Sequence, residues 1–337
     1  MKYKGTLVSG KPEEKLNAGL KAPEDIIKIV QNYYEVNCIF ANIPWASDNG
    51  FIKKVLRKFY KFCFILKCIS KHFLIIQNNF FVPFLINKYV VIIHDLTGLR
   101  FKMSDIERKE LRFLKKAQCV ISHNSAMTYY LVSMGIDKSK IVNLELFDYL
   151  CDEVDYKEMK IKSALIVAYA GNLDKAPFLT QLQDEKMNFY LRLYGVSEKL
   201  IFSEKIEYAG KTQPDKLPSM IDADLGLVWD GNIDSSDEKD LLKNYTKYNN
   251  PHKVSCYLAA GIPVVVWSKS AISQFVKEYN CGYCIENIYD LNSLDLYDYE
   301  TKKKNAIELS KKVRIGYFTK KALDKAFQIS GVKIKEK

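Results

Sequence analysis

Short apolar runs alternate with amphipathic, charged segments along nearly the whole chain. The apolar runs have the length and β-branched content of strands, and some are apolar on both faces, as in a covered parallel sheet. In the first half of the chain they predict strands at residues 36–43, 73–77, 89–94 and 119–122. The segments between them, two of which open on helix-capping residues, predict helices at 50–70, 104–116 and 124–135.

This alternation stops at residues 147–162, which have no clear period, and then restarts. The second series predicts strands at 164–170, 189–194, 205–208, 225–229 and 263–267, and a helix at 299–326. Two successive series predict two doubly wound α/β domains with parallel sheets, at 1–152 and 153–316, with a final helix at about 317–337 that packs back on the first. Ligands of such sheets bind beyond the carboxyl ends of the strands, so we expect an active site in a cleft between the domains.

The composition agrees with two globular domains and narrows the choice of partners. A formal net charge of +11 over 337 residues favours nucleic acid, an anionic membrane surface or a phosphorylated substrate. No nucleic-acid-binding module is recognisable, so we do not expect nucleic acid. The eight cysteines are scattered and no secretory signal precedes them, which predicts reduced thiols in a cytoplasmic protein.

The predicted helix at 50–70 is basic and amphipathic. Its lysines and arginine are interleaved with apolar residues: Phe51, Lys53, Lys54, Val55, Arg57, Lys58, Phe59, Lys61, Phe62 and Phe64. We favour a helix that covers a sheet and exposes a solvated basic face. The alternative is peripheral attachment to the inner face of an anionic membrane, close to a lipid-linked acceptor.

The most informative stretch is Asn250-Pro-His-Lys-Val-Ser-Cys-Tyr-Leu-Ala-Ala-Gly-Ile-Pro263. Pro251 suits the first position of a helix and Gly261 the residue just after its end. The N-terminus of this helix, with its free N–H groups and positive dipole end, can hold a diphosphate. The alternative is a well-capped helix with exposed charges. The side chains at its cap and first turn are those of Asn250 as N-cap, His252, Lys253 as a phosphate-binding cation, and Ser255.

Asn250-Pro-His-Lys-Val-Ser and Tyr257-Leu-Ala-Ala-Gly-Ile-Pro resemble the donor-side signature of GT-B glycosyltransferases. More narrowly, they are similar to a bacterial family of Gtf3-type glucosyltransferases and β-1,6-galactofuranosyltransferases. The similarity extends to Asn17-Ala-Gly-Leu-Lys-Ala-Pro, His94-Asp-Leu-Thr-Gly-Leu-Arg and Ala170-Gly-Asn-Leu-Asp-Lys. It implies the GT-B fold, in which two Rossmann-like domains face a cleft, the N-terminal domain meets the acceptor and the C-terminal domain binds the nucleotide sugar.

Further candidates for donor contacts lie in loops and at predicted strand ends. Glycine in such a loop lets the backbone approach a ligand, and lysine or arginine can neutralise phosphate. The resemblance implies donor contacts at Gly171, Asn172, Lys175 and Lys211, although residues 171–175 can also be an ordinary strand-to-helix turn with a surface lysine. The other candidates are Arg192, near a predicted strand end, and Asn17 and Gly19, in a loop before a helix predicted to begin near Ala22 or Pro23.

His94 and Asp95 end a predicted buried strand, where catalytic groups of α/β enzymes tend to lie. An inverting transfer needs a base for the acceptor hydroxyl, and either residue can serve. A retaining transfer would use the donor phosphate more directly. The alternative for His94 is a structural histidine in the turn, which is the reading we favour for His123.

No metal or cofactor is expected. Asp222-Ala-Asp224 matches the D-x-D metal signature of the other major glycosyltransferase fold, but it runs directly into a predicted strand and indicates a turn. We expect metal-independent transfer, with a helix dipole and lysines in place of a cation. No G-x-G-x-x-G follows a predicted strand, which argues against a nicotinamide or flavin enzyme. Cys281-Gly-Tyr-Cys284 lacks the second pair of ligands of a structural zinc site.

The resemblance therefore implies a transferase that moves a glucosyl or galactofuranosyl group from a UDP-sugar to a sugar acceptor on a cell-surface glycan or glycoprotein. Self-association is an expectation that the resemblance adds. Two alternatives remain open: a UDP-sugar epimerase with the same two-domain fold, and a transferase-like subunit that only stabilises a partner transferase.

Overall fold

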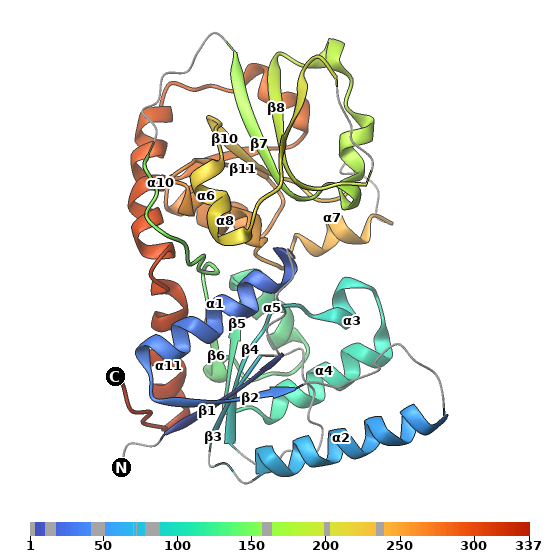
Figure 1. The fold of residues 1–337 in the computed structure, drawn as a ribbon, viewed down its shortest axis with the longest axis vertical. Helices are drawn as coiled ribbons and strands as arrows, with labels where there is room; N and C mark the ends of the chain where they lie inside the picture. The colour runs from blue at the N-terminus through green and yellow to red at the C-terminus, as the bar shows by residue number, and fades with distance from the viewer. Residues whose placement is uncertain are drawn as a thin grey trace. The chain divides into compact units, whose positions relative to one another are not determined.

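A computed structural model describes residues 4–10, 18–41, 51–69, 71, 73–77, 88–156, 164–198, 203–233 and 239–337 (Figure 1). The chain forms two compact units. The first contains Met1–Glu14, Pro23–Leu144 and Thr319–Lys337, and the second contains Lys15–Ala22 and Glu145–Phe318. The main change of unit falls after Leu144, somewhat before the predicted boundary at residue 152.

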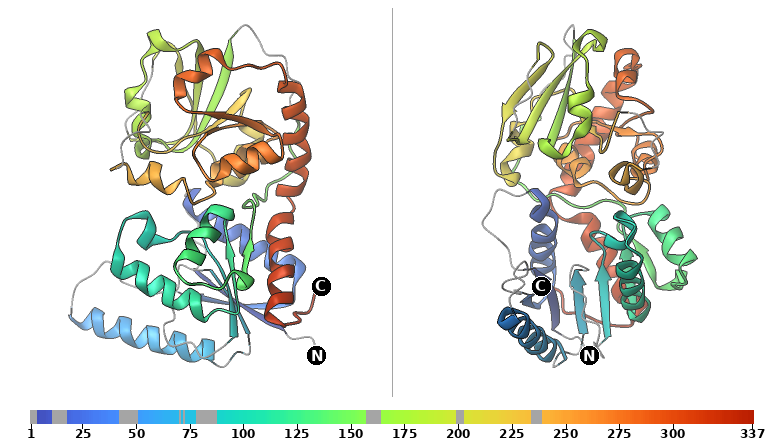
Figure 2. Two further views of the ribbon diagram at one scale, coloured as in Figure 1. Left: turned by 180° about the vertical axis from the view of Figure 1, so that it is seen from behind. Right: turned by 90° about the vertical axis from the view of Figure 1, so that its right-hand side faces the viewer.

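The first unit is built on a six-stranded parallel sheet in the order β2-β1-β3-β4-β5-β6. One apolar cluster joins this sheet to α4, α5 and the C-terminal half of α2. Helix α1 lies on the other face (Figure 2). The strands are β1 (Gly5–Gly10), β2 (Val36–Ala41), β3 (Phe73–Gln77), β4 (Lys88–Ile92), β5 (Cys119–Ser122) and β6 (Ile141–Asn143). The helices are α1 (Ala18–Tyr33), α2 (Phe51–Ile69), α3 (Thr97–Arg100), α4 (Ser104–Lys116), α5 (Ser125–Ser133) and most of α11 (Tyr317–Ser330).

The second unit has another six-stranded parallel sheet, in the order β12-β11-β10-β7-β8-β9. Helices α8, α9 and α10 cover one face, and short 3₁₀ segments between residues 173 and 186 cover part of the other. The strands are β7 (Leu165–Asn172), β8 (Phe189–Val196), β9 (Ile206–Gly210), β10 (Leu225–Val228), β11 (Val264–Trp267) and β12 (Gly282–Ile285). The helices are α6 (Leu217–Met220), α7 (Leu241–Tyr245), α8 (His252–Ala259), α9 (Ile272–Glu278) and α10 (Tyr299–Val313).

Two doubly wound parallel sheets confirm the predicted fold class. Three strands, β1, β6 and β12, were not predicted, because each has only two or three apolar residues, which are flanked by glycine or polar residues. The single long helix predicted at 299–326 is wrong. The chain breaks there at Gly316, whose φ of 82° ends α10 before α11 begins. Among the helices that the structure describes, none is both long and apolar enough to cross a membrane.

Candidate active site

The carboxyl edge of the second sheet has a point where the strand order reverses. Strand β7 pairs with β8 on one side and with β10 on the other, and ligands of doubly wound sheets bind at such a point. Four neighbouring strands are followed or closed here by glycines with positive φ: Gly231 (80°), Gly171 (146°), Gly195 (145°) and Gly210 (102°). A Cβ at Gly195 would lie 1.7 Å from the carbonyl oxygen of Gly171, so these two backbones touch. The edge is therefore lined by main chain.

Lys253 lies at this reversal point. It projects from the first turn of α8, and its Nζ is 2.6 Å from Oδ1 of Asp230, just after β10. The ammonium also lies 4.9 Å from the centre of the Tyr169 ring in β7, and a Cβ at Gly171 would be 3.3 Å from Lys253 Cε. Burial lowers the pKa of Lys253, but Asp230 and Tyr169 outweigh it and raise the pKa above its ordinary value. The site therefore holds a permanent cation with a fifth of its side chain exposed.

The other side chains of the predicted phosphate motif hold the segment that enters the unit. Asn250 Nδ2 donates to the carbonyl of Glu145 at 2.8 Å, and Ser255 Oγ donates to that of Phe147 at 2.6 Å. His252 Nε2 donates to the carbonyl of Asp148 at 3.1 Å. The prediction of Asn250 as N-cap is wrong, because Pro251 takes that position and the Asn250 amide is engaged elsewhere.

His252 is neutral at physiological pH. Its ring stacks on Tyr149 with centroids 4.9 Å apart, and burial lowers the pKa of the imidazole to about 4. Of the four side chains predicted at the phosphates, Lys253 is thus the one that brings a positive charge to the edge. The predicted end of the helix is confirmed. Gly261 has a φ of 66°, and the N–H of Ile262 donates to the carbonyl of Tyr257, as in a Schellman motif.

The remaining donor candidates are spread along the same sheet. Asn172 is the last residue of β7, and Lys175 and Lys211 follow the ends of β7 and β9; all three side chains are exposed. Arg192 was expected near a strand end, and this is wrong, because β8 continues to Val196. Its guanidinium, in the middle of the strand, binds Glu207 at 2.8 Å and Asp222 at 2.7 Å.

Two candidates belong to the N-terminal segment. Asn17 lies outside the described residues. Gly19 was predicted to lie in a loop before a helix that begins near Ala22. It lies instead in the first turn of α1, which begins at Ala18.

Asp222 and Asp224 form the turn between α6 and β10, as predicted. They lie at the amino end of β10, so they are at the opposite edge from Lys253. Asp222 binds Arg192, and Asp224 accepts the N–H of Ile166 at 2.8 Å. Within the described ranges, no three His, Cys, Asp or Glu side chains come together as metal ligands.

In the first unit, a chain of hydrogen-bonded polar groups crosses the carboxyl ends of β1, β3 and β4; Ser9 and Gln77 are buried and His94 is half-buried. Gln77, at the end of β3, donates through Nε2 to Ser9 Oγ at 2.9 Å and to the Pro23 carbonyl at 3.1 Å. Its Oε1 therefore accepts from Nε2 of His94, just after β4. This assignment leaves the lone pair of neutral His94 on Nδ1. The sheet order also reverses here, because β1 lies between β2 and β3.

The loop after His94 is held in place by a buried carboxylate. Glu110 of α4 accepts the N–H of Thr97 at 2.8 Å and that of Gly98 at 3.0 Å, at the start of α3. A Cβ at Gly98 would lie 2.3 Å from the backbone nitrogen of Glu107, so the loop sits directly on α4. Asp95 in this loop pairs with Arg100 at 2.9 Å. His94 and Asp95 are therefore neighbours in a rigid loop, but they have different partners.

Gln77, Ser9, Glu110 and Asp230 were not among the predicted site residues. Gln77 and Asp230 carried a usable signal, because each is a polar residue that directly ends an apolar run. Ser9 and Glu110 carried none, since their partners lie elsewhere in the sequence.

His123 is structural, as predicted. It is almost fully buried, its Nε2 donates to the Ile93 carbonyl at 3.0 Å, and burial lowers its pKa to about 4. Because this pKa lies below the ordinary 6.5, the unfolded chain binds the proton more readily than the folded one between these values.

We expect acid to destabilise the protein through His123. The free energy of unfolding should fall between about pH 7 and pH 4, with roughly 3 kcal/mol of this fall due to His123. In H123Q, whose amide can donate to the same carbonyl but does not titrate, that part of the fall should disappear. Urea unfolding at both pH values measures this, and equal falls in the two proteins would contradict it.

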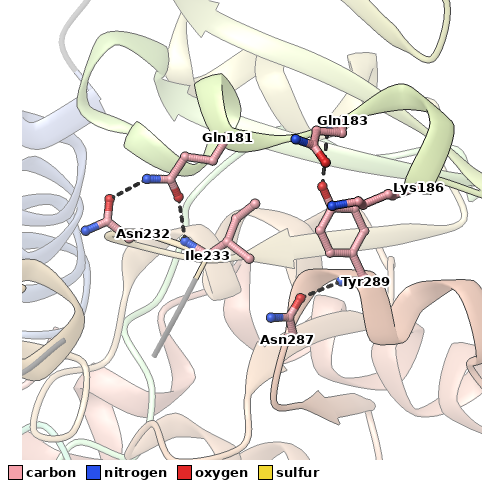
Figure 3. A pocket seen from close by; sticks show the side chains of 7 residues that line it. All are labelled: Gln181, Gln183, Lys186, Asn232, Ile233, Asn287 and Tyr289. Carbon is pink, nitrogen blue, oxygen red and sulfur yellow. Dashed lines mark hydrogen bonds between the residues drawn. The ribbon is translucent and has the colours of Figure 1, made fainter. Parts of the chain in front are cut away.

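A separate hollow of about 480 Å³ opens on the second unit (Figure 3). Its lining residues are Gln181, Gln183, Lys186, Asn232, Ile233, Asn287 and Tyr289. Gln181 bonds the Asn232 side chain and the Ile233 N–H, both at 2.8 Å, so its amide is already used within the protein. The hollow contains none of the predicted site residues. We place the candidate site at Lys253, where the charge lies.

The chain is similar to a known family and to several known proteins. The family model described as "Glucosyltransferase 3-like, N-terminal domain" matches residues 79–146, and the one described as "Glucosyltransferase 3-like, C-terminal domain" matches residues 167–326. The chain is 30% identical over 331 residues to β-1,6-galactofuranosyltransferase WbbI of Escherichia coli K12, covering 91% of this chain and 94% of WbbI. It is 24% identical over 242 residues to Glucosyltransferase 3 of Streptococcus gordonii, covering 70% of each.

Among solved structures, Anabaena Alr3699/HepE in complex with UDP is similar with a TM-score of 0.61 and 11% identity. The match covers 98% of this chain and all of that one, and the same protein is also known in complex with UDP-glucose. At this identity the likeness establishes the fold, which is GT-B. The chain belongs to the Glucosyltransferase 3-like family of GT-B glycosyltransferases.

Proposed function

We propose that the protein transfers a glucosyl or galactofuranosyl group from a UDP-sugar to a sugar acceptor on a cell-surface glycan or glycoprotein. The observation that carries the proposal is the Lys253 ammonium, held at the strand reversal of the second sheet and at the start of α8. The names of WbbI and Glucosyltransferase 3 support galactofuranose and glucose as the transferred sugars. The UDP and UDP-glucose complexes of HepE support a uridine diphosphate sugar as the donor.

The donor diphosphate would lie at the N-terminus of α8. Breaking the glycosidic bond leaves negative charge on the departing UDP, and a fixed cation lowers the energy of the transition state as that charge develops. Lys253 supplies the cation and the helix dipole adds to it. Gly171 and Gly195 let the diphosphate approach the main chain of the edge. We therefore expect transfer to continue in the presence of EDTA.

The acceptor hydroxyl would lose its proton to a base in the first unit. We assign this role to His94, with Asp95 as the second candidate. Gln77 keeps the proton of neutral His94 on Nε2, so that Nδ1 can accept one. Asp95, in contrast, forms an ion pair with Arg100. The sugar then receives the acceptor oxygen as UDP leaves.

Calorimetric titration with UDP in EDTA tests the donor site. In K253A, binding should weaken by about 1.5–3 kcal/mol, the usual contribution of a hydrogen bond to a charged group. K277A removes an exposed lysine from α9 in the same unit and should bind UDP like the wild type.

Equal UDP affinity in K253A and wild type would place the diphosphate elsewhere. Conversion of UDP-glucose or UDP-galactofuranose to another sugar nucleotide without acceptor would indicate an epimerase. A folded protein that binds no UDP species would indicate a subunit without catalysis.

A further inference from the structure

Helix α2 of the first unit carries an apolar stripe that nothing described in the chain covers. Val55, Phe59, Phe62 and Leu66 recur at spacings of four, three and four residues, so they share one face of the helix. Their side chains are 51, 62, 56 and 50% exposed, which is unusual for four large apolar residues in a row. Figure 1 shows α2 at the periphery of the unit.

The packed side of α2 is a different one. Cys68 is fully buried, and Phe64 and Ile65 are partly buried against the same apolar cluster of the sheet. Phe64 and Cys68, four residues apart, define a face roughly opposite to the stripe. The stripe is thus directed away from the unit's own core.

The charge of α2 has one sign. The helix contains Lys53, Lys54, Arg57, Lys58, Lys61 and Lys67, and no aspartate or glutamate. The side chain of Lys58, next to Phe59, is exposed. Two copies of this helix would repel each other, which disfavours a second copy of this chain as the partner. A partner that binds this face of α2 has to accommodate aromatic side chains and also carry negative charge.

We propose that α2 binds the surface of an anionic lipid bilayer and lies in its plane. Phe59 and Phe62 enter the boundary between headgroups and acyl chains, where aromatic rings are favoured. The exposed side chains of Lys58 and Lys67 stay at the level of the lipid phosphates. The six basic residues of this 19-residue helix are incompatible with its spanning the bilayer. The inference does not depend on the proposed sugar transfer.

Co-sedimentation of the full-length protein with vesicles tests the proposal. We expect binding to vesicles of phosphatidylcholine mixed with phosphatidylglycerol, and much weaker binding to phosphatidylcholine alone. Higher salt should weaken the first of these. In the F59S/F62S double variant, partitioning should fall about tenfold or more, because two exposed rings no longer enter the bilayer. K58A should lower binding to the anionic vesicles about fivefold.

Y129S is the matched control. Tyr129 is an exposed aromatic residue of α5 in the same unit, and its replacement should leave vesicle binding unchanged. Near-ultraviolet circular dichroism of each variant shows whether it is folded. Equal binding of the wild type to both kinds of vesicle, or equal binding by F59S/F62S and Y129S, would overturn the proposal. So would a change of oligomeric state in F59S/F62S without vesicles, because the stripe would then bind a second copy.

Discussion

Replacing His94 with alanine is expected to lower kcat for sugar transfer by about a hundredfold to ten-thousandfold, the usual contribution of a general base. The KM for the UDP-sugar should change little, because the proposed donor contacts belong to the second unit. We assign the role of base to His94 because its hydrogen bond to Gln77 fixes the imidazole in one tautomer and orientation. Initial rates at saturating donor and acceptor measure both constants.

Two variants separate a base from a structural histidine. Q77L leaves His94 in place but removes the hydrogen bond that orients its ring, so it should lower kcat less than H94A does. If H94A retains kcat and D95N loses it, then Asp95 is the base. If neither changes kcat, then the donor phosphate serves as base, as in a retaining transfer.

Replacing Gly195 with alanine is expected to destabilise the second unit by about 3–5 kcal/mol. Two costs combine. A φ of 145° is open to glycine and closed to alanine, and the new Cβ would lie 1.7 Å from the Gly171 carbonyl oxygen. Two of the three tryptophans, Trp229 and Trp267, are buried in this unit, so most of the change in tryptophan fluorescence during urea unfolding follows its stability.

G210A is the matched control for G195A. Gly210 also has a positive φ, 102°, but a Cβ there would meet nothing within 4 Å. Its replacement should cost about 1–2 kcal/mol, from backbone strain alone. Equal losses of stability in the two variants would mean that the contact between Gly195 and Gly171 adds nothing to the cost of G195A.

The sequence was most informative where burial leaves little choice. Strands that are apolar on both faces, such as β4, β10 and β11, can be recognised because parallel sheets bury both sides. Strand β1 could not, since only Leu7 and Val8 stand out in its run. The helix end at Gly261 was predictable because its signal is local, within a few residues of the chain.

The roles of the side chains at residues 250–255 were less predictable, because they depend on partners far away in the sequence. Asn250, His252 and Ser255 bond carbonyls more than a hundred residues earlier in the chain, and no local pattern announces such partners. Lys253 was identified from its place at a helix start, but its partner Asp230 was not. The pairing depends on β10 and α8 lying side by side, which only the folded sheet provides.

The glycine row at the edge of the second sheet has a consequence for how donor preference can diverge within the family. Gly171, Gly195, Gly210 and Gly231 offer a ligand only peptide groups, and peptide groups are alike in every sequence. If the donor binds here as we propose, this edge recognises what all the donors have in common and does not distinguish one hexose from another. We therefore expect a change of sugar to arise from side chains beside the row, and we expect the glycines of the row to be the same in enzymes with different products.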